Sequence, residues 1–540
     1  MGLSTYDAFG RLTGLTYPSG AAFGYGYNAN GQISGVSYQP ARSQAASALI
    51  SQIGYQPFGP VNGWSMGNGA TYARSFDQDG RISGLTLPAN DTIAVTDDAA
   101  SRIKALTETG LATKTFGYDK LNRLTGYASG TNTETFSYDA DGNRIDAVSV
   151  TGTTKVSDIY SYDTKSNRLL KIAGTVSESV LKLAGTVVSE TFGYDKSGNT
   201  TADAIAASDF VYSYDAKNRL AASANGPLSL AYGINGLGQR TSKSNTSTGS
   251  TTAARVSLAY DPPQTYFVYD GVGHLIGQYD GSGVAHQETV WLGDLPVATI
   301  QAGTAYYIAP DYLGAPHQIT DPSQNVVWFW DHDPFGTTAP TGTLTYSLRF
   351  PGQFYDPLTG LNYNGFRDYD PATGRYIESD PIGLAGGVNT YGYAGGNPVS
   401  GIDPLGLWCW STFANSFNTN FANAQSDLHT LAFHLVSAPI SFGSSVFIES
   451  DASVFAATGF VRPIDAIKSI LKPSIFGTIG FGALGGVQTA VSGLANFAVD
   501  AAIGGTAFFA GVEAGFALGS AGVATYDAAN DNSSENCGCQ

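Results

Sequence analysis

Cysteine is scarce in this sequence. Its three cysteines are Cys409, Cys537 and Cys539, so the first 407 residues contain none. A disulfide framework is therefore excluded for that part of the chain. Cys537 and Cys539 are too close together for the usual zinc or redox spacing, and no histidine follows them. We therefore predict that the protein needs neither a metal nor another cofactor.

Charge is also sparse, and cations are rarer than acids. Charged residues make up 13% of the chain, and 27 Lys and Arg stand against 44 Asp and Glu, for a formal net charge of −17. Because binding to phosphate groups relies on clustered Lys and Arg, and no basic run is present, we predict that nucleic acid is not a partner. The residues after Met1 lack the basic and apolar regions of a cleaved signal peptide, so export by that route is not expected.

Common catalytic motifs are missing as well. The sequence contains neither an HExxH motif nor a P-loop. The histidines before residue 408 do not have the paired spacing of a metal site. We therefore interpret His274, His286, His317 and His332 as structural residues.

Glycine and tyrosine are abundant instead, with 67 and 31 residues, and both recur in a short repeat. The unit reads aromatic-Asp-x-x-(Gly/Asn)-Arg-(Leu/Ile) and fills most of residues 1–260. Its fifth position holds the two residues that best tolerate positive φ, and the flanking residues alternate as in strands. Each unit therefore predicts a β-hairpin with a tight turn. Clear copies are Tyr6–Leu12, Phe76–Ile82, Tyr118–Leu124 and Tyr214–Leu220.

Residues 375–407 contain a doubled turn motif. Asp380-Pro381-Ile382-Gly383-Leu384 is followed, after eighteen residues, by Asp403-Pro404-Leu405-Gly406-Leu407. Taken alone, each Asp-Pro-x-Gly is a turn, because Asp accepts backbone N–H groups, Pro fixes φ and Gly supplies a positive φ. Further turn motifs precede it in a fixed order: Tyr269–Leu275, Asp311–Pro316, Trp330–Gly336, Arg349–Asp356 and Arg367–Pro371.

The repeats, the ordered motifs and the doubled DPxGL together resemble the RHS (rearrangement hot spot) family with its YD repeats. The resemblance implies a mainly β fold, in which a YD-repeat sheet ribbon over residues 1–260 is spiralled into a hollow cocoon. It implies an RHS-associated core over residues 261–407 that cuts the chain between Leu407 and Trp408. It further implies that residues 408–540 are a variable toxin used in interbacterial competition.

The same resemblance implies partners and a route of delivery. A toxin of this family is expected to have a cognate immunity protein and a secretion-system component that caps the shell. Without a signal peptide, the protein is expected to be secreted or delivered to the cell surface by a specialised secretion system.

The residue after Leu407 narrows the chemistry of a cut at this place. An intein-like acyl shift needs Ser, Thr or Cys there, and the sequence has Trp408; the core also lacks cysteine and a convincing Ser-His pair. Carboxylates remain, and Asp380 and Asp403 are the candidates for an aspartyl dyad that activates water. The resemblance points most directly at Asp380. Asp403 has a second interpretation as the turn residue that presents the bond, and Arg375 is a candidate for orienting the pair.

Residues 408–540 differ in composition from the rest of the chain, with three cations against nine acids. Residues 474–499 are uncharged, and residues 501–526 contain one acid, Glu513, with glycines spaced for close helix packing. We expect a mainly α, Gly/Ala-rich domain. Two interpretations stay open: a hairpin with Asp500 at its tip that inserts into a target-cell membrane, and the buried helices of a soluble toxin.

Two alternatives to a self-cleaving shell also fit the repeats. In the first, the chain is a structural or adhesive YD-repeat protein of the cell surface, without toxin activity or cleavage. In the second, it is a truncated orphan copy, because the sequence opens inside a repeat and shows no recognisable N-terminal delivery domain. The complete order of core motifs before residue 408 favours the self-cleaving shell.

Overall fold

The computed structural model describes residues 3–57, 59–178, 186–205, 208–247 and 262–407. The chain divides into two compact units, and every described residue belongs to the unit that contains residues 1–416. The predictions for residues 408–540, including their α-helical character and the roles of Trp408, Asp500 and Glu513, lie outside the described residues.

Short antiparallel strands make up almost all of the described structure. The large sheet contains β1 (Leu3–Tyr6), β2 (Leu12–Thr16), β3 (Ala22–Tyr27), β4 (Ile33–Gln39), β5 (Ser47–Tyr55), β6 (Val61–Met66), β7 (Thr71–Phe76), β8 (Ile82–Thr86), β9 (Thr92–Asp97), β10 (Ile103–Glu108), β11 (Lys114–Tyr118), β12 (Leu124–Ser129), β13 (Asn132–Tyr138), β14 (Arg144–Thr151), β15 (Thr154–Tyr162), β16 (Leu169–Glu178), β17 (Thr186–Tyr194), β18 (Thr200–Ile205), β19 (Ser208–Tyr214), β20 (Leu220–Asn225), β21 (Leu228–Ile234), β22 (Arg240–Asn245), β23 (Gln264–Tyr269), β24 (Leu275–Asp280), β25 (Ala285–Leu292), β26 (Leu295–Gln301), β27 (Thr304–Pro310), β28 (Pro316–Thr320), β29 (Val326–Phe329) and β30 (Thr341–Gly342). The small sheet contains β31 (Phe354–Tyr355), β32 (Asn362–Asn364), β33 (Arg367–Asp370) and β34 (Arg375–Tyr376). Three 3-10 turns are η1 (Pro88–Asn90), η2 (Gly383–Gly386) and η3 (Ala394–Gly396).

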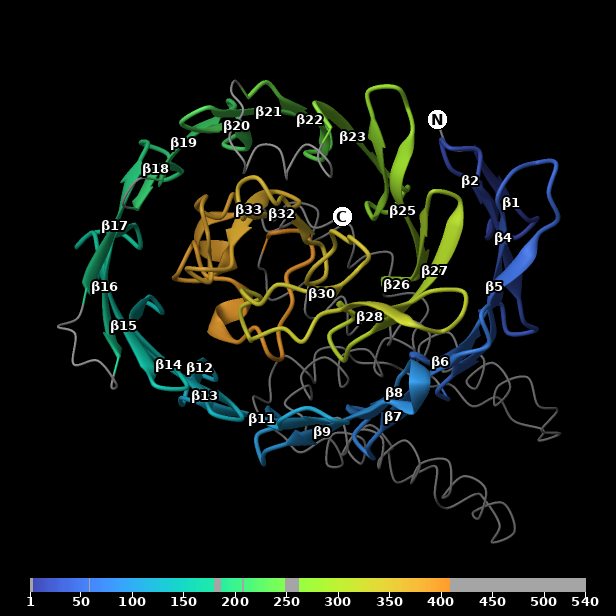
Figure 1. Ribbon diagram of the computed structural model, residues 1–540, viewed down its shortest axis with the longest axis horizontal. Helices are drawn as coiled ribbons and strands as arrows, with labels where there is room; N and C mark the ends of the chain where they lie inside the picture. Colours follow the sequence, from blue (N-terminus) through green and yellow to red (C-terminus); the bar gives the residue numbers. More distant parts are fainter. Residues whose placement is uncertain (1–2, 58, 179–185, 206–207, 248–261, 408–540) are drawn as a thin grey trace, which may run out of the picture. The chain divides into compact units, whose positions relative to one another are not determined.

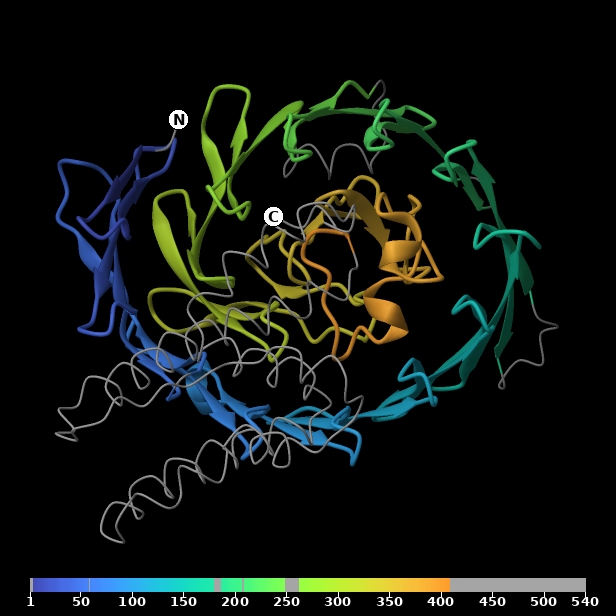
Figure 2. The ribbon, with the colours of Figure 1, turned by 180° about the vertical axis from the view of Figure 1, so that it is seen from behind.

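The thirty strands of the large sheet form a continuous meander, in which each strand pairs with the next one along the chain. Within this unit the sheet curves into a wall around the small sheet, and views from the front and from behind agree on this (Figures 1 and 2). The predicted mainly β cocoon is therefore confirmed. The wall also runs without a break in pairing from β22 to β23, across the predicted division between residues 1–260 and 261–407.

The Asp of the YD repeat clamps the turn of each hairpin. Asp7 Oδ1 accepts hydrogen bonds from the backbone N–H groups of Phe9 and Arg11, and its Oδ2 accepts one from Arg11 Nε at 2.7 Å. Gly10 and Asn122, at the fifth position of two repeats, have φ of 79° and 64°. The predicted positive φ at this position is confirmed. The Asp-Arg contact recurs in Asp77-Arg81, Asp98-Arg102, Asp119-Arg123 and Asp215-Arg219.

The tyrosine of the repeat joins neighbouring hairpins. Tyr118 Oη donates to the carbonyl oxygen of Ile103 at 2.7 Å, and the guanidinium of Arg102 lies 4.9 Å from the centroid of its ring. A cation over an aromatic face is an attractive contact, so each repeat holds the one that follows. The same two contacts link Tyr138 to Leu124 and Arg123.

Curvature brings early and late strands of the wall together. Apolar side chains of β2–β10 share one buried cluster with side chains of β24–β27, among them Leu15, Trp64, Val290 and Ile300. Tyr17 Oη donates to the carbonyl oxygen of Thr289 at 2.7 Å across the same contact. The burial of this apolar surface stabilises the curved form of the sheet.

The central segment, which we define as residues 354–407, is bound to the wall through polar contacts. Tyr391 Oη donates to the carbonyl oxygen of Gly198 at 2.7 Å. Lys243 Nζ, on β22, lies 3.1 Å from Asp356 Oδ1, and both side chains are buried. These contacts attach the central segment, which carries the doubled DPxGL, to the wall.

Candidate active site

Two Asp turns in the central segment carry the predicted carboxylates. Asp380 Oδ1 accepts the backbone N–H of Ile382 at 3.0 Å, and Gly383 follows with a φ of 59°. Asp403 Oδ1 accepts the backbone N–H of Leu407 at 3.0 Å. Both DPxGL motifs therefore form turns of the kind that the sequence predicts.

Arg367, on β33, brings the two carboxylates together. Its Nη2 lies 2.9 Å from Asp380 Oδ2 and 3.2 Å from Asp403 Oδ2. Because both oxygens contact one nitrogen atom, they cannot be farther apart than the sum of these two distances. The three side chains are buried, with exposures of 1%, 5% and 2% for Arg367, Asp380 and Asp403. Two acids this close and this deeply buried affect each other's protonation.

Asp403 is held from a second side by Tyr376 and Asn364. Tyr376 Oη donates to Asp403 Oδ2 at 2.7 Å, and Asn364 Nδ2 donates to Tyr376 Oη at 2.7 Å. Asn364 Nδ2 also donates to the carbonyl oxygen of Asp403 at 2.8 Å. Since Leu407 donates to Oδ1, each carboxylate oxygen of Asp403 accepts a hydrogen bond. These contacts suit an ionised carboxylate in one fixed orientation.

The same arginine contacts the peptide that precedes Leu407. Arg367 Nε donates to the carbonyl oxygen of Gly406 at 2.6 Å, and Nη1 donates to that of Thr390 at 3.1 Å. Its guanidinium lies 3.6 Å from the centroid of the Tyr376 ring. Arg367 thus connects both acids to the residue beside the predicted cleavage site.

Glycines let the chain approach residues 404–406 closely. A Cβ on Gly365 would lie 2.5 Å from the carbonyl oxygen of Leu405, and one on Gly352 would overlap the carbonyl group of Pro404. Gly406 has a φ of 66°, and a Cβ on it would overlap the carbonyl oxygen of Asn364. Residues 404–406 are therefore packed backbone to backbone, which restricts movement of the chain just before Leu407.

Burial shifts both acids toward their protonated forms. It raises the pKa of Asp380 to about 6, against the opposing effect of the Arg367 guanidinium, and the charge of Asp403 adds to the rise. Burial also raises the pKa of Asp403, against the effects of Arg367 and of the Tyr376 hydrogen bond. A carboxyl group that titrates near neutral pH can both accept and return a proton.

Arg375, which the sequence suggested as the residue that orients the acids, points elsewhere. Its Nη1 donates to Asn143 Oδ1 at 3.3 Å, and its guanidinium lies 4.9 Å from the centroid of the Tyr162 ring. Successive side chains of a strand point to opposite faces, so β34 directs Arg375 at the wall and Tyr376 at Asp403. The contact that orients the acids comes from Arg367, which sequence reasoning missed.

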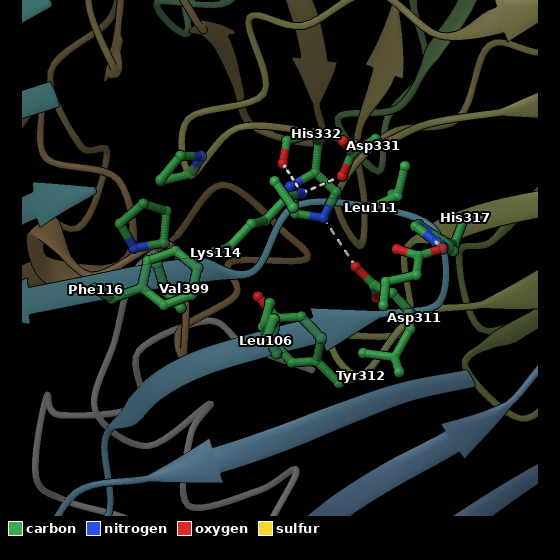
Figure 3. A pocket seen from close by; sticks show the side chains of 15 residues that line it. Leu106, Leu111, Lys114, Phe116, Asp311, Tyr312, His317, Asp331, His332 and Val399 are labelled. Carbon is green, nitrogen blue, oxygen red and sulfur yellow. Dashed lines mark hydrogen bonds and ion pairs between the residues drawn. The ribbon is translucent and has the colours of Figure 1, made fainter. Parts of the chain in front are cut away.

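A second buried polar cluster surrounds a cavity of about 30 Å³ between β10, β11 and residues 311–334 (Figure 3). His317 Nε2 lies 2.8 Å from Glu108 Oε1, and His332 Nε2 lies 3.0 Å from Asp311 Oδ2. The other ring nitrogen of each histidine contacts a backbone carbonyl oxygen. Since both imidazoles are fully engaged and the cavity has room for only one or two waters, this cluster connects strands. These contacts agree with the structural interpretation of the two histidines.

Metal sites, membrane-spanning helices and nucleophile motifs are three further features that could give the described residues a function. Over these residues, no group of three or more His, Cys, Asp or Glu side chains is placed to hold a metal ion. The same residues include no helix that is long and apolar enough to cross a membrane. Gly63–Gly67 has the Gly-x-Ser-x-Gly spacing of a nucleophile elbow, but Ser65 lies within β6 and not at a strand-to-helix turn.

A curved wall of YD-repeat hairpins around a central segment is the fold of a class of proteins, the YD-repeat β-shells. The Teneurin YD-shell family model matches residues 92–230 and 292–399, and the RHS Repeat family model matches residues 6–43. The chain belongs to the RHS/YD-repeat family.

Two curated bacterial toxins are similar to parts of the chain. Double-stranded DNA deaminase toxin A of Burkholderia cenocepacia (strain H111) is 29% identical over 363 residues, which are 55% of this chain and 25% of the relative. Toxin protein Tse5 of Pseudomonas aeruginosa is 41% identical over 98 residues, which are 18% of this chain and 7% of the relative. The chain thus spans a quarter or less of the length of these two relatives.

A solved structure supports the fold. The crystal structure of TcdB2-TccC3 matches with a TM-score of 0.52 and 18% sequence identity, covering 75% of this chain and 22% of that chain. At this level of identity, the similarity concerns the fold alone.

Proposed function

We propose that this chain is an encapsulating RHS-type shell that cuts itself after Leu407 and carries a C-terminal toxin used in interbacterial competition. The observation that supports self-cleavage most is the position of Arg367, which contacts Asp380, Asp403 and the carbonyl group beside Leu407. Stability of the fold gives no reason for such an arrangement, because burying two carboxylates around one guanidinium costs desolvation free energy.

In the proposed reaction, the two acids have different roles. Asp403 remains ionised and holds the chain, because its two oxygens accept hydrogen bonds from Leu407 and Tyr376. Asp380 moves the proton, since burial raises its pKa to about 6 and it can therefore change protonation near neutral pH. In this mechanism Asp403 acts through its charge, which raises the pKa of Asp380, and through the turn that holds Leu407.

The proposed steps balance as a peptide hydrolysis. The carboxylate of Asp380 takes a proton from a water molecule as the water oxygen bonds to the carbonyl carbon of Leu407. Protonated Asp380 then donates that proton to the amide nitrogen of Trp408 as the C–N bond breaks. The products are a carboxyl group on Leu407 and a free amine on Trp408, so the protein acts once as an aspartyl autoprotease.

Intact mass and N-terminal sequencing of the purified protein test this proposal. The expected result is two fragments, of which the smaller comprises the 133 residues from Trp408 to Gln540. A single uncut chain in fully folded wild-type protein would contradict the proposal and favour the structural or adhesive alternative.

For residues 408–540 we propose toxin activity with one of two targets. The stretches on either side of Asp500 have the lengths of membrane-spanning helices, which supports insertion into a target-cell membrane. The similarity to a double-stranded DNA deaminase toxin supports a nucleic-acid target instead, against our prediction from composition. The released fragment should therefore be assayed on dye-loaded liposomes and on DNA: leakage supports the first target, and altered DNA supports the second.

A toxin of this kind needs partners to protect the producing cell and to reach its target. We propose a cognate immunity protein, a delivery component that caps the shell, and a specialised secretion system. Expression of residues 408–540 alone should stop growth, and co-expression of the immunity protein should restore it. The fragment should be directed to the cytosol in one strain and to the periplasm in another. Unimpaired growth of both strains would count against a toxin.

A further inference from the structure

Two YD repeats have an arginine at the seventh position, which directly follows the position of the usual repeat arginine. In the repeats that end at Leu124, Leu169 and Leu220 this residue is a leucine that is at most 2% exposed, and in the repeat that ends at Thr200 it is a threonine. Two repeats instead have Arg144 and Arg240 at this position, and both of these are buried as well. A charged residue at a core position of a repeat requires a specific partner.

Arg240 has such a partner in the central segment. Its Nη2 lies 2.9 and 3.0 Å from the two carboxylate oxygens of Asp368, on β33. The rings of Tyr232 and Tyr363 lie against its guanidinium, with centroids at 3.9 and 4.4 Å. Tyr363 Oη also accepts the backbone N–H of Arg240 at 2.8 Å. The start of β22 is thereby held against β33, which Figure 1 shows inside the arc of β20–β22.

Asp368 is the immediate neighbour of Arg367. Because successive side chains of a strand alternate, β33 directs Asp368 at the wall and Arg367 at Asp380 and Asp403. The backbone N–H of Asp368 donates to Glu378 Oε2 at 2.8 Å, and Glu378 precedes Asp380 by two residues. A displacement of Asp368 therefore moves the guanidinium that joins the two acids.

Stability alone does not account for the pair of Arg240 and Asp368. A buried ion pair stabilises a fold no more than well-packed apolar side chains of similar size, and leucine occupies the equivalent position in neighbouring repeats. What a buried ion pair adds is a defined relative position of the two strands that it joins.

We infer that Arg240 is a positioning residue for self-cleavage, which acts through Asp368 on Arg367. The cut after Leu407 then occurs only once the wall at β22 has formed around the central segment. This inference rests on the proposed self-cleavage. It explains how a chain that cuts itself avoids doing so before its shell is assembled.

The double variant Arg240→Leu with Asp368→Asn tests the inference. The double variant removes both charges, so that neither charge is left buried without its partner. It also gives β22 the leucine that stands at this position in the repeats ending at Leu124, Leu169 and Leu220. Uncut chains isolated unfolded from inclusion bodies are diluted into refolding buffer, and the Trp408 fragment is followed by gel and mass spectrometry. We expect a wild-type circular dichroism spectrum, cleavage slowed by roughly tenfold or more, and a shifted pH profile, because Arg367 would contact Asp380 less closely.

A second buried ion pair between β22 and the central segment supplies the matched control. Lys243→Met with Asp356→Asn removes a pair of similar burial. Asp356 also accepts a hydrogen bond from Tyr232, which packs on Arg240, but unlike Asp368 it is not adjacent in the chain to Arg367. We expect its cleavage rate to stay within about twofold of wild type. Equal slowing in both double variants, or wild-type cleavage in the folded Arg240→Leu/Asp368→Asn chain, would overturn the inference.

Two further variants keep the test decisive. If Arg240→Leu/Asp368→Asn does not fold, Arg240→Lys is tested in its place. Lysine retains the positive charge but cannot donate to both carboxylate oxygens of Asp368 in the geometry of a guanidinium. A wild-type cleavage rate and pH profile in Arg240→Lys would overturn the inference. Asp380→Asn separates the inference from the proposed function. If Asp380→Asn is cut normally, the proposed mechanism itself is wrong.

Discussion

At the scale of residues, the repeats and the acid site both pair aspartate with arginine, but the pairs differ in how deeply they are buried. Asp7 pairs with Arg11 near the surface. Desolvation there is outweighed by the combined hydrogen bonds from Arg11 and Phe9, so the pKa of Asp7 is lowered. In the central segment, Arg367 pairs with two buried acids, and burial outweighs the guanidinium. The raised pKa of Asp380 thus follows from burial and from the nearby charge of Asp403.

The first prediction at this scale concerns the pH dependence of self-cleavage. Asp380 must be ionised to accept a proton from water, and its pKa is raised to about 6. The cleavage rate of refolding chains should therefore rise as the pH increases through about 6 and level off above it. A rate that is constant across this range would show that Asp380 does not act as the base.

The second prediction concerns His274, which occupies the arginine position of its repeat. Although burial opposes it, hydrogen bonds with Asp270 and Asp294 raise the pKa of His274 to about 9. A raised folded-state pKa means that this stabilisation is fully present below the ordinary histidine pKa and is lost as the pH rises through about 9.

Thermal unfolding of the wild type and of His274→Arg checks this second prediction. The wild-type Tm should fall by roughly 2 °C or more between neutral pH and a pH above about 9. His274→Arg keeps a permanent cation at the clamp and should lack that part of the decrease. The prediction fails if both proteins lose the same Tm over this range.

The sequence identified the two acids but not the cation between them. Asp380 and Asp403 could be recognised because each lies in a repeated turn motif. Arg367 could not be distinguished from Arg375 in the sequence, because each arginine begins a short strand beside a turn. Only the alternation of side chains along these strands decides which arginine faces the acids. Contacts between residues far apart in a chain leave no local pattern.

At the scale of elements, the hairpins and the DPxGL turns differ in what surrounds their glycines. Gly10, at a repeat turn, has a φ of 79° and open space where a Cβ would be. Gly406 has a φ of 66° and lies directly against the backbone of Asn364. The first glycine serves the turn alone, whereas the second also allows the chain before Leu407 to pack closely.

The third prediction compares alanine at these two glycines. Gly406→Ala should abolish or strongly slow self-cleavage, because the new Cβ would push residues 404–406 away from Asn364. Gly10→Ala should cost only about 1–2 kcal/mol from the left-handed backbone and leave cleavage unchanged. Cleavage in refolded chains and urea unfolding measure both effects; a Gly406→Ala chain that cuts at the wild-type rate would refute the close-packing argument.

The hairpins themselves could be predicted because every determinant is local. The alternation of the flanking residues, the Asp clamp and the Gly or Asn at the fifth position all lie within one repeat. The repeats that dock on the central segment were not predicted, although Arg144 and Arg240 mark them as exceptions to an apolar position. When the copies of the repeat are aligned with one another, an arginine at a position that usually holds leucine indicates a repeat that contacts another part of the fold.

At the scale of the whole described unit, one sheet joins the repeats to the core motifs. The meander continues from β22 into β23, and the central segment contacts Lys243 on β22 and Phe267 on β23. The fold therefore links assembly of the wall to the position of the acids. Family membership agrees with a toxin shell, while the activity of residues 408–540 has to be measured on that segment itself.

The most direct test of the central claim compares Asp380→Asn with the wild type. Asparagine has nearly the same shape but cannot accept and return a proton at the pH of the reaction. Both chains are refolded under the same conditions, and the fraction cut after Leu407 is measured by intact mass while circular dichroism confirms the β fold. The account predicts a fully cut wild type and an intact Asp380→Asn chain; a folded Asp380→Asn chain that is cut at the same bond and rate would contradict it.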